Sequence, residues 1–282
     1  MGKNIIICSD GTGNTFEKRI TNVTRLVWHL DLDQPDRQVV CYDQGVGTTA
    51  QRKKAVSRTA ASPGHGTALC LLPAPAAGWF PPSNWVSRGR GLLFGDGLEE
   101  NVSQMYRKLA QLYEGPEDRV FLFGFSRGAF TVRALAGLLY RCHLPRRGQD
   151  DIDRRFERAW KLFQPMMADM DAVRDLRRDH RPCPVHFMGL WDTVKSYGGL
   201  DPVILPHLRH NPDATHVRHA LALDERRAWF KPTTWGQLDI DRDNAMTRLD
   251  PHDEAGYEAQ DISEVWFTGC HSDIGRGNLT LR

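Results

Sequence analysis

This sequence contains no run of about eighteen consecutive apolar residues, and its N-terminus carries only the four-residue apolar stretch Ile5 to Cys8. A membrane-spanning helix needs about twenty apolar residues and a secretory signal peptide needs a longer apolar core, so we expect neither. An excess of one charge is also missing, because 37 basic and 35 acidic residues leave a net charge of +2. Nothing global favours nucleic acid as a partner, and we expect a protein made in the cytoplasm.

Closely spaced cysteines and the common nucleotide-binding motifs are absent too. The six cysteines form no CxxC pair, and Cys8, Cys41 and Cys270 lie in or beside strand-like runs. Buried, reduced thiols are therefore expected rather than disulfides. Neither G-x-x-x-x-G-K-[ST] nor G-x-G-x-x-G occurs, so nucleotide binding is the weaker interpretation of the glycine-rich stretch near the N-terminus.

Strand-like and helical runs alternate along the 282 residues, which are enough for one large domain. Such alternation predicts an α/β fold with a mostly parallel central sheet and helices on both of its faces. The expected strands are 4–8, 38–42, 120–123, 185–191 and 265–268, and the expected helices are 23–32, 98–113, 129–140, 152–163 and 215–224.

Two segments interrupt this pattern. Residues 51–90 are rich in Ala, Pro, Gly, Ser and Arg without a steady period, so we interpret them as a poorly ordered insertion in a single domain. Residues 145–182 are strongly charged and include the amphipathic helix expected at 152–163. They could form a cap over a site or a solvated surface excursion.

Each expected strand is followed at once by small or reactive residues. Because the carboxyl ends of parallel strands share one edge of the sheet, these tips should gather into a ligand site. The five tips are Ser9-Asp10-Gly11-Thr12-Gly13-Asn14, Asp43-Gln44-Gly45-Val46-Gly47, Gly124-Phe125-Ser126, Asp192-Thr193 and Gly269-Cys270-His271-Ser272-Asp273.

Residues 124–128 read GFSRG, which matches the G-x-S-x-G nucleophile elbow. That motif requires a strand before the serine and a helix after it. Here the apolar run VFLF precedes Ser126 and helical periodicity begins at Ala129. The alternative, a glycine-rich turn with an incidental serine, is disfavoured by these flanks. We predict that Ser126 is a nucleophile on a strained strand-to-helix corner.

A serine hydroxyl needs a base, and a carboxylate must orient that base. In α/β-hydrolases the chain order is serine, acid, histidine, which Asp192 and His271 satisfy. Asp192 could instead cap a turn or a helix. Asp224 is the second choice for the acid, although it lies in or at the end of the helix expected at 215–224. The other histidines fit less well, with His186 expected inside a strand and four more in loops or on a helix surface, namely His207, His210, His216 and His219.

Acyl transfer also needs donors for an oxyanion. The backbone N–H of Arg127 is the expected first donor, and the loop that contains Gly11, Thr12 and Gly13 is the expected source of the second. The same loop could instead cradle a phosphate. Asp10 could order it or bind a cation together with Asp273. A metal-assisted phosphoesterase that uses Asp10, Asp192, His271 and Asp273 is therefore a minor alternative, although we expect no metal and no cofactor.

Six sequence blocks in register resemble one known family. They are SDGTGNT, YDQGVGT, FLFGFSRGAFTVRALAGLL, GLWDTV, ALALDERRAWFKPT and WFTGCHSDIGRG, and they run in order from about Asn4 to Gly277. The family is an uncharacterised group of α/β-hydrolase domains that includes the phospholipase effectors of the bacterial type VI secretion system. The resemblance implies an α/β-hydrolase fold and a serine esterase or lipase, phospholipase-like in some relatives, with Ser126, Asp192 and His271 as its triad. It also implies that export without a cleavable signal is an option.

The chain departs from that family in two ways. Relatives have a shorter, glycine-rich stretch in place of 51–90, and they continue into further helices where this sequence ends eleven residues after His271. The resemblance thus implies a C-terminal part that is truncated, and the alternative function is a degenerate family member that acts as a binding or interaction protein.

The substrate and the oligomeric state cannot be read from the sequence. A lipid or small ester is the expected substrate class. Six aromatic residues could line an acyl pocket or contact a membrane peripherally, although scattered aromatics are more often core. They are Trp79, Phe80, Trp85, Trp229, Phe230 and Trp235.

Overall fold

The computed structural model describes ten stretches of the chain. They are residues 2–11, 20–44, 68–72, 96–164, 169–195, 197–198, 201–202, 205–209, 211–235 and 260–276. Within them no helix is long and apolar enough to cross a membrane.

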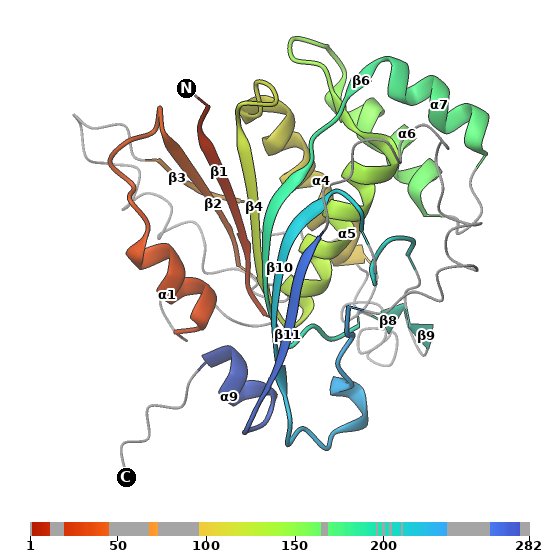
Figure 1. Ribbon diagram of the computed structural model, residues 1–282. Helices are drawn as coiled ribbons and strands as arrows, with labels where there is room; N and C mark the ends of the chain where they lie inside the picture. Colours follow the sequence, from red (N-terminus) through yellow and green to blue (C-terminus); the bar gives the residue numbers. More distant parts are fainter. Residues whose placement is uncertain are drawn as a thin grey trace, which may run out of the picture.

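Seven parallel strands form the central sheet (Figure 1). In spatial order they are β11 (Asp261–Phe267), β10 (Ala214–Ala222), β7 (Val185–Trp191), β4 (Arg119–Phe125), β1 (Asn4–Ser9), β2 (Gln38–Asp43) and β3 (Leu69–Leu71). Central strands of such a sheet are buried on both faces, which is why β1 reads as the continuous apolar run IIIC. Two short antiparallel pairs join β5 (Leu144–Pro145) to β6 (His180–Arg181) and β8 (Tyr197–Gly198) to β9 (Asp201–Pro202).

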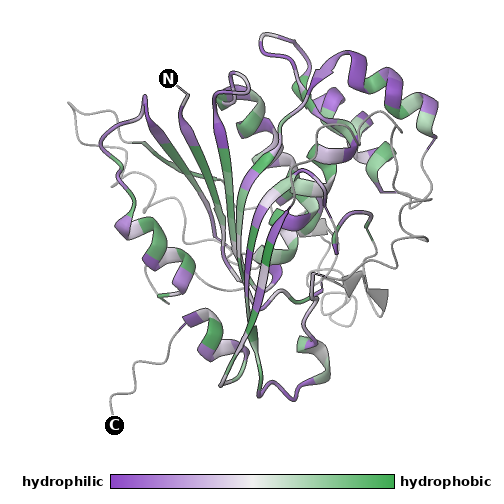
Figure 2. Cartoon of the chain, in the orientation of Figure 1, coloured by the Kyte–Doolittle hydropathy of each residue, from purple (hydrophilic) through white to green (hydrophobic). Residues whose placement is uncertain are grey.

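Helices cover both faces of the sheet, so the predicted α/β class with a mostly parallel central sheet is confirmed. On one face α1 (Asn22–His29) packs Val23 and Val27 against Ile6 and Val40, and Thr21 caps its N-terminus. On the other face lie α4 (Asp96–Leu112), α5 (Arg127–Cys142) and α6 (Ile152–Phe163), which build the larger core. The hydrophobic strands between these layers stand out in Figure 2. Two further helices are α7 (Met170–Arg178) and α9 (His271–Arg276), and Ala228–Phe230 form one turn of 3₁₀-helix.

The prediction of a helix at 215–224 is wrong, because residues 214–222 form β10. The spacing of Val217 and Leu221 suggests a helix, but the buried side chains alternate at Val217, His219 and Leu221. This period of two matches a strand paired on both sides, with β7 and β11. Pairing with two neighbours outweighs the weak helical preference of the Ala, Leu and Arg residues in this run.

The two interrupting segments differ in how much of them the structure describes. From 51–90 it describes only residues 68–72, which form the edge strand β3 and its flanks, so the remainder of that prediction lies outside the described residues. From 145–182 it describes α6 and α7, which pack on α5 and lie at the upper right of Figure 1, whereas α9 lies at the lower left. The described part of this segment therefore does not lie over the tip that carries His271.

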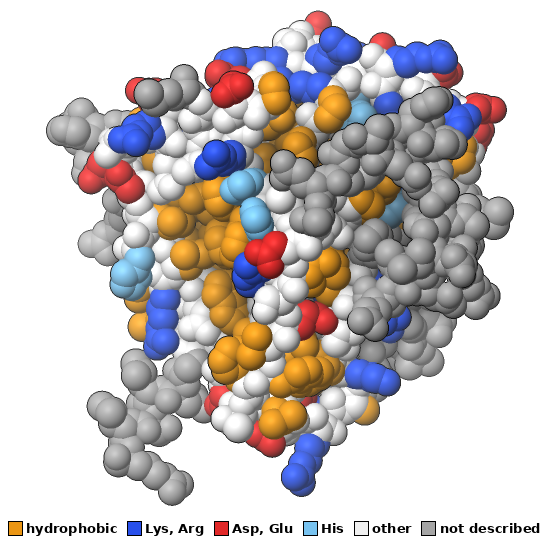
Figure 3. Space-filling model, viewed as in Figure 1, with side chains coloured by type: hydrophobic (Ala, Val, Ile, Leu, Met, Phe, Trp, Pro, Cys, Tyr) orange, Lys and Arg blue, Asp and Glu red, His pale blue; other side chains and the backbone are white. Residues whose placement is uncertain are grey.

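The edge strand β11 carries unusually exposed apolar side chains. Val265, Trp266 and Phe267 are 46%, 48% and 50% exposed, and Figure 3 shows hydrophobic side chains gathered over much of the viewed face. All six cysteines are free thiols, as expected, with Cys70 and Cys270 only half-buried.

Candidate active site

Ser126 lies on a sharp corner between β4 and α5. Its backbone has φ 59° and ψ −123°, a strained conformation for a residue with a side chain. The corner is compact, because a Cβ at Gly124 would lie 2.6 Å from the Ala129 backbone. A Cβ at Gly128 would lie 2.2 Å from the carbonyl oxygen of Ser9. Only glycine fits at either position, so these two residues allow the corner and bring it against the β1 tip.

The structure brings Ser126, Asp192 and His271 together in one chain of hydrogen bonds. The His271 Nδ1 lies 2.6 Å from Asp192 Oδ2, and its Nε2 lies 2.8 Å from Ser126 Oγ. A carboxylate can only accept, so Nδ1 carries the hydrogen and Nε2 is left to accept from the serine hydroxyl. All three side chains are buried, which keeps bulk water from competing for these bonds.

Asp192 is held at the end of β7 by the strand beside it. Its backbone has φ 39°, its other carboxylate oxygen accepts the N–H of Ala222 at 3.0 Å, and its own N–H donates to the Ala220 carbonyl. Asp224, the second choice for the acid, follows β10 instead of lying in a helix. Its carboxylate accepts the N–H of Gly269 at 2.7 Å.

His271 begins α9, and two aromatic rings contact its imidazole. The ring of Phe125 stacks on it at 4.8 Å between centroids, and that of Phe230 lies at 4.8 Å with a tilt of 54°. The backbone N–H of His271 donates to Glu225 Oε2 at 3.2 Å. Sequence reasoning missed Glu225 as a site residue and considered Phe230 only as a lining of an acyl pocket, although both lie in the block ALALDERRAWFKPT, which was the only signal available.

The β1 tip lies beside the serine corner, where an oxyanion donor is expected. Asp10 orders this tip, because its carboxylate accepts the hydroxyls of Thr21 and Tyr42 at 2.6 and 2.8 Å. It also accepts the N–H of Gly11. Thr12 and Gly13, the other predicted donors of this loop, lie outside the described residues. The backbone N–H of Arg127 is the other expected donor. Burial lowers the pKa of the Arg127 side chain to about 10.

A second buried histidine, His219, contacts Thr193, the residue after Asp192. His219 Nδ1 lies 2.7 Å from Glu264, so it donates there, and Nε2 accepts the Thr193 N–H at 3.2 Å. Burial lowers the pKa of His219 below its ordinary value, which keeps the ring neutral.

The other histidines differ in how well their predicted locations hold. The expected loop or helix-surface location is wrong for His216 and His219, because both lie in β10. His207 does lie in a described loop, where it is buried. His186 is in β7, as expected, and His210 lies outside the described residues.

The acidic residues considered for a cation have other partners. Asp273 accepts the Cys270 N–H at 2.8 Å at the start of α9, while Asp10 is bound to Thr21 and Tyr42. Within the described stretches, no three His, Cys, Asp or Glu side chains are grouped closely enough to hold a metal ion.

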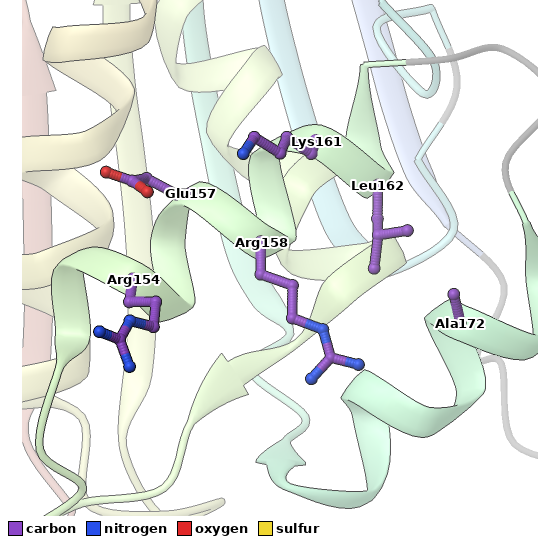
Figure 4. A pocket seen from close by; sticks show the side chains of 6 residues that line it. All are labelled: Arg154, Glu157, Arg158, Lys161, Leu162 and Ala172. Carbon is purple, nitrogen blue, oxygen red and sulfur yellow. The ribbon is translucent and has the colours of Figure 1, made fainter.

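A hollow of about 340 Å³ lies away from these residues, between α6 and α7 (Figure 4). Charged side chains make up most of its lining, and none of the strand tips contributes to it. The lining residues are Arg154, Glu157, Arg158, Lys161, Leu162 and Ala172.

Comparisons with known proteins add a family and several relatives. A family model described as T6SS, Phospholipase effector Tle1-like, catalytic domain matches residues 3–281. An uncharacterized protein of Saccharomyces cerevisiae is 29% identical over 244 residues, which are 82% of this chain and 32% of that protein. The chain thus spans about a third of that curated relative.

Solved structures resemble the chain at low sequence identity. An uncharacterized protein from Pseudomonas aeruginosa has a TM-score of 0.46 and 18% identity, covering 98% of this chain and 42% of that one. The Tle1 effector bound to the VgrG spike from the Type 6 secretion system has a TM-score of 0.41 and 17% identity, covering 97% and 51%. Zea mays acyl-protein thioesterase 2 has a TM-score of 0.35 and 10% identity, covering 96% and 87%.

Proposed function

The chain belongs to the family of Tle1-like catalytic domains of type VI secretion phospholipase effectors, and from this premise we propose that it is a serine hydrolase of carboxylic esters. The proposed substrates are lipid esters, with phospholipids first. The observation that carries the proposal is the hydrogen-bond chain from Asp192 through His271 to Ser126. Those three groups have the roles, order and spacing that acyl transfer to a serine requires.

In the proposed reaction, Ser126 Oγ attacks the ester carbonyl while His271 Nε2 takes its proton. Asp192 keeps the imidazole in the Nδ1–H form and stabilises the imidazolium that results. The backbone N–H of Arg127 and a donor of the β1 tip bind the oxyanion. His271 then returns the proton to the leaving alcohol, which leaves an acyl group on Ser126 Oγ.

Water completes the cycle. His271 takes a proton from a water molecule, whose oxygen attacks the acyl carbonyl, and the second tetrahedral intermediate expels Ser126 Oγ as that proton returns to it. The products are the free acid and the unmodified enzyme. The proposed chemistry uses only groups of this chain, and lipid substrates would require contact with a lipid surface during turnover.

The test is hydrolysis of a short-chain p-nitrophenyl ester and of a fluorogenic phospholipid by the parent chain and by Ser126→Ala. We expect activity in the parent and a loss of at least about 10³-fold in the variant, since the nucleophile is gone. A fluorophosphonate probe should label the parent only. Ser103→Ala, which alters a buried serine of α4 away from the triad, is the matched control and should keep full activity.

Two outcomes would overturn the proposal. Activity that survives Ser126→Ala but disappears on chelation would indicate a metal-assisted hydrolase. A folded parent that neither hydrolyses these esters nor reacts with the probe would indicate a family member that binds without catalysis.

A further inference from the structure

We propose that Glu225, Arg227 and Phe230 form a histidine clamp, a set of positioning residues that holds His271 in register with Ser126. The inference rests on the proposed function, because it assigns a role in the same proton transfer. It also gives a role to residues 224–230 of the block ALALDERRAWFKPT, which supply no member of the triad.

The first contact of the histidine clamp is to the backbone of the base. Glu225 Oε2 accepts the N–H of His271 at 3.2 Å. This N–H is the first of α9, so no carbonyl of the helix is available to it. One residue earlier in the chain than Glu225, Asp224 accepts the N–H of Gly269, and its own N–H donates to the Gly269 carbonyl. The loop that carries His271 is thus tied at two points to the turn after β10.

The second contact fixes the carboxylate itself. Arg227 donates to Glu225 through its backbone N–H at 2.8 Å, through Nε at 2.8 Å and through Nη2 at 2.7 Å. The Glu225 side chain is only 3% exposed, while that of Arg227 is 52% exposed. A buried carboxylate with this many donors has one preferred orientation. These bonds also lower the pKa of Glu225 to about 2, so it stays ionised at any working pH.

The third contact reaches the imidazole. The guanidinium of Arg227 lies 4.0 Å above the ring of Phe230, and Phe230 in turn lies against His271. Phe125 also stacks on the imidazole, and Gly275 of α9 leaves room for the Phe125 ring. The histidine clamp therefore contacts His271 at two places, the backbone N–H and one ring face.

Such control matters because the base comes from a distant part of the chain. His271 is 145 residues from Ser126, and Gly269 before it has φ 114°, which only glycine adopts freely. A flexible hinge next to the base would let Nε2 drift from the serine hydroxyl. A displacement of about 1 Å can cost about 10²-fold in rate. The histidine clamp removes that freedom.

The test compares Glu225→Ala with Glu225→Gln, whose amide oxygen can still accept the His271 N–H. We expect kcat per probe-labelled site to fall about ten- to hundredfold in Glu225→Ala with KM changed less than twofold. Glu225→Gln should recover part of the loss, because its amide oxygen keeps the His271 N–H bond while its NH2 group faces two donors of Arg227. Asp175→Ala is the matched control, because it removes a carboxylate that pairs with Arg178 at 2.7 Å on α7, away from the triad. A Glu225→Ala protein with the parent's kcat per labelled site would overturn the histidine clamp.

A second measurement does not depend on activity. The Nδ1–H that His271 donates to Asp192 should give a far-downfield proton resonance, identified by its loss in His271→Ala. The His219 Nδ1–H on Glu264 supplies an internal reference. We expect Glu225→Ala to broaden or remove the His271 signal and to leave that of His219. An unchanged His271 signal would overturn the histidine clamp, whereas an inactive parent with both signals would overturn only the proposed function.

Discussion

Gly128 is a residue whose lack of a side chain holds the serine corner in place. A Cβ there would lie 2.2 Å from the Ser9 carbonyl oxygen and 2.6 Å from that of Asp10, and both are backbone atoms that cannot rotate away. We expect Gly128→Ala to cost about 1–3 kcal/mol of unfolding free energy. Probe labelling of Ser126 should slow by about 10²-fold, because the corner must shift.

Denaturant melts and labelling rates measure both effects. Gly115→Ala is the control, since a Cβ at that position meets nothing within 4 Å. Parent-like stability and labelling in Gly128→Ala would contradict the close packing of the β1 tip against the corner.

At the scale of residues, the sequence is most informative about side chains that stand directly after strands. Ser126, Asp192 and His271 could be chosen because each comes after an apolar run, and such tips share an edge. The contacts of Glu225 and Phe230 with His271 could not be predicted, since they depend on how the turn after β10 folds back onto the start of α9. Side chains that act through loop contacts leave no periodic signal.

At the scale of elements, the end of α5 contains a pH-sensitive contact. His143 follows the helix, and Arg177 of α7 donates to its Nε2 at 3.0 Å. Burial, with Arg177 nearby, lowers the pKa of His143 from 6.5 to about 3. Below pH 6.5 the unfolded chain therefore binds a proton that the folded chain does not, so this histidine makes folding less favourable as the pH falls.

His143→Asn tests this contribution. Between pH 7 and pH 5 the parent should lose about 2 kcal/mol more unfolding free energy than the variant, which cannot titrate. Urea melts at the two pH values give the difference, and His29→Asn on the exposed side of α1 is the control. Equal losses in parent and His143→Asn would show that the contact with Arg177 does not govern the acid sensitivity.

The strand β10 shows where element prediction from sequence fails. Strands β1, β4 and β7 can be predicted because their apolar runs are short and continuous, whereas β10 mixes His, Arg and Ala with its apolar residues. Its buried His219 is paired with Glu264 of β11, a partner 45 residues away. A polar residue can occupy a strand interior when such a partner exists, and the local sequence does not reveal it.

At the scale of the whole molecule, Arg133 of α5 ties distant segments together. Its buried guanidinium donates to the carbonyls of Leu208, Thr233 and Thr234 at 2.6, 2.6 and 3.2 Å, and it lies over the Trp235 ring. Burial lowers the pKa of Arg133 to about 9, which still leaves it charged at neutral pH. One side chain thus joins the central helix to two separate loops.

We expect Arg133→Met to lower the unfolding free energy by about 3–5 kcal/mol, because the carbonyls lose a charged donor inside the core. Chemical denaturation measures the loss. Arg178→Met on α7 is the control. The Arg178 side chain is exposed, and the ion pair described for its guanidinium is with Asp175 on the same helix. A loss below about 1 kcal/mol for Arg133→Met would show that the loops hold their positions without it.

The order of the proposed triad residues along the chain determines the order in which they are synthesised. Asp192 precedes its histidine by 79 residues and Ser126 precedes it by 145. At roughly 5–20 residues per second, the ribosome makes Ser126 roughly 7–30 seconds before His271. A nascent chain therefore carries Ser126 before it carries the residue that we propose as its base. A hydrolase with the proposed triad would stay inert toward esters until β11 and the residues after it have been translated.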